Sequence, residues 1–134
     1  MVSGKYIAAG ISAMWLFCGC QSAIDHSTPR RLIESYAHAF AAGDYDSMVE
    51  AWSPETRKMT RKFAEDNQLE ERDFVKFMIA CGGSSSEKSA GKMADDPEFL
   101  QQMIDKELSL LKVVTGKREE GVILIDGKWY LQFF

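Results

Sequence analysis

The hydrophobic and polar positions follow a helical period over most of the chain and a strand period only near its C-terminal end. Thr28-Pro29 is typical of a helix start, because Thr caps the first turn and Pro needs no backbone donor there. The helix that follows is predicted to end at Gly43, and its apolar face consists of Leu32, Ile33, Tyr36, Ala39 and Phe40. Asp44 is the predicted cap of a second helix, whose apolar face is Tyr45, Met48, Val49 and Trp52.

The middle of the chain repeats these helix-start signals. Ser53-Pro54 predicts a third helix, and Asn67 with Glu70 resembles a capping box before a fourth. Gly82–Asp95 is rich in Gly and Ser, which predicts one long flexible loop. Asp96-Pro97 then predicts a further helix.

From Val122 onward, the helical spacing of hydrophobic residues gives way to the two-residue alternation of a β-strand. Asp126-Gly127 predicts a β-hairpin with a type I′ turn, which pairs Leu124 with Trp129 and Val122 with Leu131. These four residues and Phe133 are expected to face the core. An isolated hairpin is marginal in water, so Leu110–Thr115 is predicted as a third strand. The fold class predicted is α+β, with N-terminal helices packed on a small C-terminal antiparallel sheet, a three-stranded meander.

Charge and composition narrow the possible partners. The 134 residues suffice for one domain and carry a net charge of −4. Beyond Gly19 the remainder, with 15 basic and 20 acidic residues, has a net charge of −5. A mildly acidic surface disfavours nucleic acid as a partner, because binding phosphates requires a basic face.

The N-terminal residues have the pattern of an export signal. Lys5 is followed by an uncharged stretch, Tyr6–Gly19, which is too short for a typical membrane span and fits the apolar region of a signal peptide. The alternatives are an ordinary cleaved signal and an uncleaved anchor. The stretch ends in Phe17-Cys18-Gly19-Cys20.

Phe17-Cys18-Gly19-Cys20 resembles the cleavage motif of bacterial lipoproteins, in which small residues precede the lipidated cysteine. Phe17 departs from the usual leucine. The resemblance implies residues 1–19 as signal peptide, Cys20 as the lipidation site, 20–28 as a tether and 29–134 as one α+β domain. It implies palmitate on Cys20, and export to the cell envelope with a membrane anchor made of lipid. Gln21 and Ser22 favour the periplasmic face of an outer membrane, if the cell has two membranes.

The domain resembles small lipoproteins of the nuclear-transport-factor-2-like superfamily, also called cone-shaped α+β or SnoaL-like. The matching residues are Tyr36–Asp46, which contain a Gly-Asp-Tyr corner, then Met48 to Pro54, and the closing Ile125–Tyr130 hairpin. The family has four or more strands around a pocket, whereas only three are visible here, so a truncated cone is the expected variant. These motifs indicate a fold and carry no chemistry.

Candidate functional residues are few. If the helix from Pro97 extends to Leu111, Glu107 lies within its apolar stripe and could serve a pocket as a buried carboxylate. The favoured alternative is that the helix ends near Lys106 and a strand begins at Leu108. Four aromatic residues could line a pocket or an interface, although their spacing favours a place in the core: Tyr36, Trp52, Trp129 and Tyr130.

No catalytic, phosphate-binding or metal-binding motif is present, so no cofactor, metal site or catalytic residue is predicted. The leading hypothesis is a lipid-anchored envelope protein that is not an enzyme and binds a protein or a small apolar ligand. One alternative is a small SnoaL-like pocket enzyme that uses Glu107 or a Tyr as acid or base. The other is a structural or assembly lipoprotein that acts through the sheet face of Tyr130.

Overall fold

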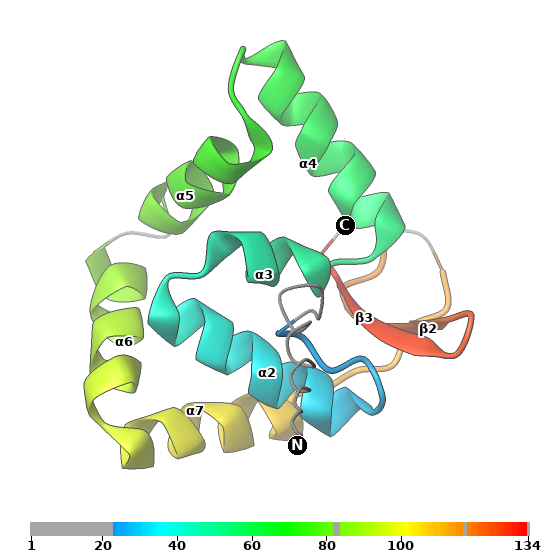
Figure 1. The fold of residues 1–134 in the computed structure, drawn as a ribbon. Coiled ribbons are helices and arrows are strands. Elements are labelled where there is room, and N and C mark those ends of the chain that lie inside the picture. The colour runs from blue at the N-terminus through cyan, green and yellow to red at the C-terminus, as the bar shows by residue number, and fades with distance from the viewer. Residues whose placement is uncertain (1–22, 82–83, 117, 134) are drawn as a thin grey trace, which may run out of the picture.

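A computed structural model describes residues 23–81, 84–116 and 118–133 of the chain. Six helices precede two strands in this part of the chain (Figure 1). The helices are α2 (Pro29–Ala42), α3 (Tyr45–Glu50), α4 (Pro54–Asp66), α5 (Glu71–Cys81), α6 (Ser84–Asp95) and α7 (Pro97–Ser109). The strands are β2 (Gly121–Ile125) and β3 (Lys128–Gln132). The fold is therefore α+β, as predicted.

The predicted helix starts are confirmed where a capping side chain precedes a proline. Thr28 Oγ1 accepts a hydrogen bond of 3.1 Å from the backbone N–H of Arg31 at the start of α2. Ser53 and Asp96 cap α4 and α7 in the same way. Gly43 ends α2 with a φ of 68°, a left-handed conformation that costs glycine little.

Two predictions in the middle of the chain are wrong. Gly82–Asp95 is not one long loop, because α6 occupies Ser84–Asp95. Ser89 and Met93, one helical turn apart, lie toward the pocket described below, and this packing outweighs the weak helix propensity of Gly and Ser. Asn67 does not start a helix. It ends α4, and its side-chain amide donates to the Phe63 carbonyl oxygen at 2.8 Å.

The β2–β3 hairpin has the predicted register and turn. Leu124 pairs with Trp129 and Val122 with Leu131. Both turn residues have positive φ, 50° for Asp126 and 79° for Gly127, as a type I′ turn requires. Val122 and Leu131 are buried. Leu124 is 52% exposed, which corrects the expectation that it faces the core, because the turn end of the hairpin extends beyond the helices (Figure 1).

The predicted third strand is not shown by the structure. At Leu110–Thr115 the described residues form a single bridge between Val113 and Val122, and that bridge is parallel. A second parallel bridge joins Trp52 to Leu131 on the opposite edge of the hairpin. Within the described part of the chain the sheet thus has two strands, and short segments from distant parts of the chain cover both edges.

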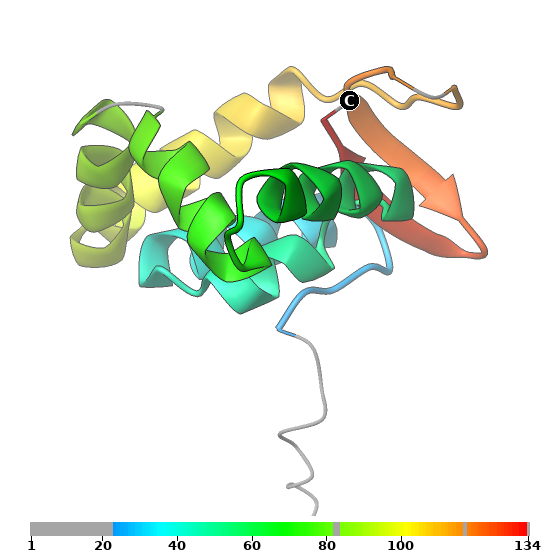
Figure 2. The same cartoon turned by 90° about the horizontal axis from the view of Figure 1, so that it is seen from above.

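The segment before α2 lies on the domain rather than apart from it. Ile24 is buried in the core cluster with Leu32 and Trp52. The Trp129 N–H donates to the His26 carbonyl oxygen at 2.9 Å, and His26 Nδ1 lies 2.7 Å from the Trp129 carbonyl oxygen. These contacts attach the beginning of the described chain to β3 (Figure 2).

Candidate functional site

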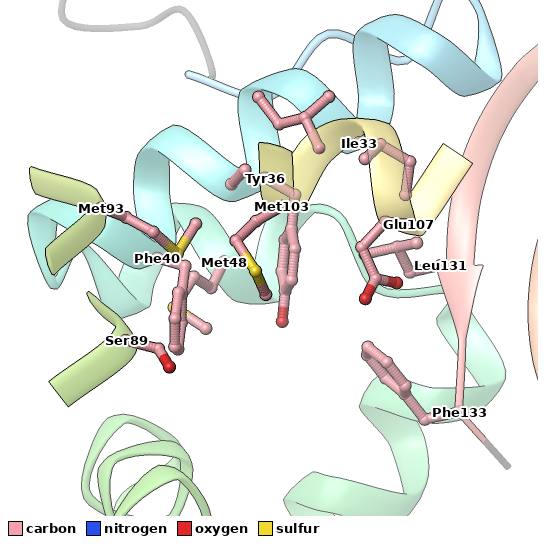
Figure 3. A pocket seen from close by; sticks show the side chains of 12 residues that line it. Ile33, Tyr36, Phe40, Met48, Ser89, Met93, Met103, Glu107, Leu131 and Phe133 are labelled. Carbon is pink, nitrogen blue, oxygen red and sulfur yellow. The ribbon is translucent and has the colours of Figure 1, made fainter. Parts of the chain in front are cut away.

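A pocket of about 430 Å³ lies among α2, α3, α6, α7 and the end of β3. Figure 3 shows its lining side chains. The described lining includes the aromatic side chains of Tyr36, Phe40 and Phe133 and the methionines Met48, Met93 and Met103. Ile33, Ala37, Ile104 and Leu131 complete the apolar lining, and the polar members are Ser89 and Glu107. A mostly apolar cavity of this size with few polar groups is typical of small-molecule sites.

Trp52 supports this pocket from behind. Its indole Nε1–H donates to the Tyr36 hydroxyl oxygen at 3.2 Å. Its ring packs edge-on against Phe133, with centroids 5.7 Å apart. Trp52 is buried and does not line the pocket, so its role is to position two side chains that do.

The hydroxyl group of Tyr36 is held in its neutral form. Burial raises the pKa of Tyr36 to about 12, although the hydrogen bond from Trp52 acts in the opposite direction. Because Trp52 donates to the hydroxyl oxygen, the phenolic proton remains available for another acceptor. Figure 3 shows the hydroxyl ending in the open space of the pocket.

Glu107 also reaches this space, which corrects both sequence expectations about it. The favoured prediction ended the helix near Lys106, but α7 continues to Ser109 and contains Glu107. The other prediction made Glu107 a buried carboxylate, yet the residue is exposed and lies at the pocket. Figure 3 shows its carboxylate between Leu131 and Phe133.

Trp129 and Tyr130 lie outside this pocket. Trp129 is half-buried and packs against the core cluster. Tyr130 lies on the other face of β3, where its ring contacts His26 with centroids 4.7 Å apart. Among the aromatic candidates, the fold therefore brings Tyr36 to the pocket, places Trp52 behind it and keeps the two hairpin residues elsewhere.

A second cleft, of about 380 Å³, lies beside Tyr130 and is polar. Its guanidinium groups are already neutralised: Arg57 lies 3.1 Å from Glu71 and 3.8 Å from Glu50, and Arg61 lies 3.4 Å from Glu71. Two arginines are shared by two carboxylates, so the positive charge that remains among the described lining residues is that of the exposed Lys128. The apolar pocket is therefore the stronger candidate site.

Residues 23–81, 84–116 and 118–133 contain neither a candidate metal site nor a candidate membrane span. No group of three His, Cys, Asp or Glu side chains there could hold a metal ion. None of the helices described is both long and apolar enough to cross a membrane. Cys20 and the predicted signal, residues 1–19, lie outside the described residues.

Several pocket residues were not anticipated from the sequence. Ser89 and Met93 lie in α6, which was predicted as a loop, and Met48 was assigned only to a helix face. The four-residue spacing of Ser89 and Met93 is a signal for a shared helix face, although a weak one within a Gly- and Ser-rich stretch. Phe133 was expected to face the core, whereas it is 37% exposed and lines the pocket.

Comparison of the chain with protein-family models, curated proteins and solved structures finds no significant match.

Proposed function

We propose that this chain is a lipid-anchored envelope protein whose domain binds a small apolar ligand in the pocket between α2, α6 and α7. The observation that carries the proposal is the cavity of about 430 Å³ with its mainly apolar lining. Burial of a ligand's apolar surface there would supply most of the binding free energy. The three methionines would adapt to its shape, because their side chains are unbranched and polarizable.

The lipid anchor is proposed on Cys20 from the lipoprotein motif. Three residues separate Cys20 from Ile24, so an extended chain spans at most about 14 Å between their Cα atoms. Ile24 is buried in the domain core. A lipid on Cys20 would therefore hold the domain close to the bilayer, with no long stalk between them.

Kinship with the nuclear-transport-factor-2-like superfamily is part of the same proposal. In support, the hairpin is flanked by extended segments bridged at Val113–Val122 and Trp52–Leu131. A cone shortened to a hairpin with these two flanking segments would still leave a pocket beside the sheet.

A pocket enzyme is the second candidate, because a phenol and a carboxylate, Tyr36 and Glu107, line the same cavity. A Tyr with a pKa of about 12 stays protonated near neutral pH and is a poor general base there. A hydrogen-bonding role for Tyr36 needs no ionisation. Binding without catalysis is therefore the function we favour.

Filling the pocket tests the binding proposal. Ala37 is half-buried and lines the cavity, so Ala37→Phe should occupy it, whereas Ala42→Phe adds the same side chain at an exposed position of the same helix. The probe is N-phenyl-1-naphthylamine, a neutral dye whose fluorescence increases in apolar sites, added to the full chain carrying Cys20→Ala. We expect dye binding by the parent and by Ala42→Phe, and its loss in Ala37→Phe. Equal binding by all three proteins would contradict the proposal.

A further inference from the structure

The pocket contains one charged side chain among its described lining residues, the carboxylate of Glu107. No ion pair between described residues involves Glu107. Its neighbours one helical turn earlier in α7 are Met103 and Ile104, which are both apolar. A cation at one of these positions would have neutralised the carboxylate within α7. The negative charge is therefore available to a ligand.

The two lysines of α6, Lys88 and Lys92, do not line the pocket. The Lys92 ammonium lies 4.3 Å from the centroid of the Phe99 ring, in a cation–π contact outside the pocket lining. Lys106 follows Glu107 in the sequence but does not line the cavity, because consecutive residues of a helix point in different directions. Among the described residues, no basic side chain lines the cavity.

The aromatic lining of the pocket also favours a cationic ligand. Tyr36, Phe40 and Phe133 present ring surfaces to the cavity, and an aromatic face attracts a cation through its quadrupole. Figure 3 shows Phe133 beside the Glu107 carboxylate. A cationic group next to Glu107 would thus lie near an aromatic ring as well, whereas an anionic head group would be repelled by the carboxylate.

Resting on the proposed binding function, we infer that the ligand is an apolar monocation, an organic amine whose charged nitrogen lies beside Glu107 and whose apolar body lies among the methionines. The chain beyond Gly19 has a net charge of −5, which also favours a cationic ligand. Fatty acids and other apolar anions are the class that this pocket disfavours.

Three compounds of matched shape test the inference: 4-phenylbutylamine, 4-phenylbutanol and 4-phenylbutyrate. Each is titrated into the full chain carrying Cys20→Ala and labelled with ¹³C at the methionine methyl groups. Shifts of Met48, Met93 and Met103 report occupancy of the pocket, while Met59 and Met78, which do not line it, serve as internal references. We expect the amine to bind about tenfold more tightly than the alcohol, since Glu107 is exposed and its attraction is partly screened.

Glu107→Gln should abolish the advantage of the amine over the alcohol. Glu65→Gln is the matched control, because it removes the same charge from an exposed site on α4 that does not line the pocket. Equal binding of amine and alcohol, or tighter binding of the carboxylate, would overturn the inference while leaving the proposed function intact. If none of the three compounds shifts the pocket methionines, the binding function and the inference both fail.

Discussion

The indole N–H of Trp52 donates a hydrogen bond of 3.2 Å to the hydroxyl oxygen of Tyr36, sixteen residues earlier in the chain. The bond crosses from the end of the α3 segment to the middle of α2. It orients the phenol at the pocket and leaves the phenolic proton for another acceptor. The buried Trp52 thereby determines how the Tyr36 hydroxyl group is oriented in the candidate site.

Replacement of Trp52 by Phe should destabilise the domain by about 1–3 kcal/mol, because a buried hydrogen bond and part of a buried ring are lost. The free energy of unfolding in urea measures this change. Trp129→Phe is the control, since Trp129 is only half-buried, and its cost should be smaller. An equal decrease in the free energy of unfolding for the two variants would contradict a special role for the Trp52–Tyr36 hydrogen bond.

The raised pKa of Tyr36 predicts a loss of stability at high pH. The unfolded phenol ionises near its ordinary pKa of 10, whereas the folded one ionises at about 12. Between these values the folded state binds more protons, so the stabilisation, present in full below pH 10, declines as the pH rises towards 12. Two pKa units correspond to about 2.7 kcal/mol.

Absorbance at 295 nm follows this ionisation directly. The spectrum of the folded protein should contain a phenolate component that appears near pH 12 and is missing in Tyr36→Phe. A Tyr36→Phe difference spectrum with its midpoint near pH 10 would show that the phenol is not protected by burial.

Ile24→Ala should destabilise the domain by about 3 kcal/mol, since Ile24 is buried in the core cluster before α2 begins. Thermal or urea unfolding measures the effect. Ala23→Ser, at an exposed neighbouring position, should leave stability nearly unchanged. A loose tether would instead make both substitutions neutral, which would contradict the packing of this segment.

Gly121→Ala should destabilise the hairpin by about 1–3 kcal/mol. Gly121 has a φ of 155°, and a Cβ atom there would collide with the Lys112 carbonyl oxygen, which accepts a hydrogen bond of 2.8 Å from the Val122 N–H. Unfolding measurements should show the loss. Gly91→Ala, where a Cβ would meet nothing within 4 Å, should be neutral or stabilising.

Cys20→Ala should release the protein from membranes and abolish its labelling by a palmitate analogue, if the cysteine carries the proposed lipid. Fractionation of cells and detection of the label measure these two outcomes. Cys18→Ala is the paired control and should retain both the label and membrane association. Labelling that persists in Cys20→Ala would rule out Cys20 as the lipidation site.

Local signals in the sequence were sufficient where the structure depends on neighbouring residues. Capping residues before Pro29, Pro54 and Pro97 predicted three helix starts, because the first turn is satisfied by side chains close in sequence. Asp126-Gly127 predicted the hairpin register for the same reason. Local signals failed for α6, where contacts with α2, α5 and α7 offset a composition typical of loops.

The sequence by itself determined the α+β class, most helix starts, the hairpin register and Tyr36 and Glu107 as candidates, and it supplied the motif on which the proposal for Cys20 rests. Only the tertiary structure decided that these two side chains share a pocket, that Trp52 lies behind it, and that Ser89, Met93 and Phe133 complete it. The physical reason is that the pocket is a space between elements far apart in the chain. Its shape depends on how their faces pack, which the hydrophobic period within each element does not specify.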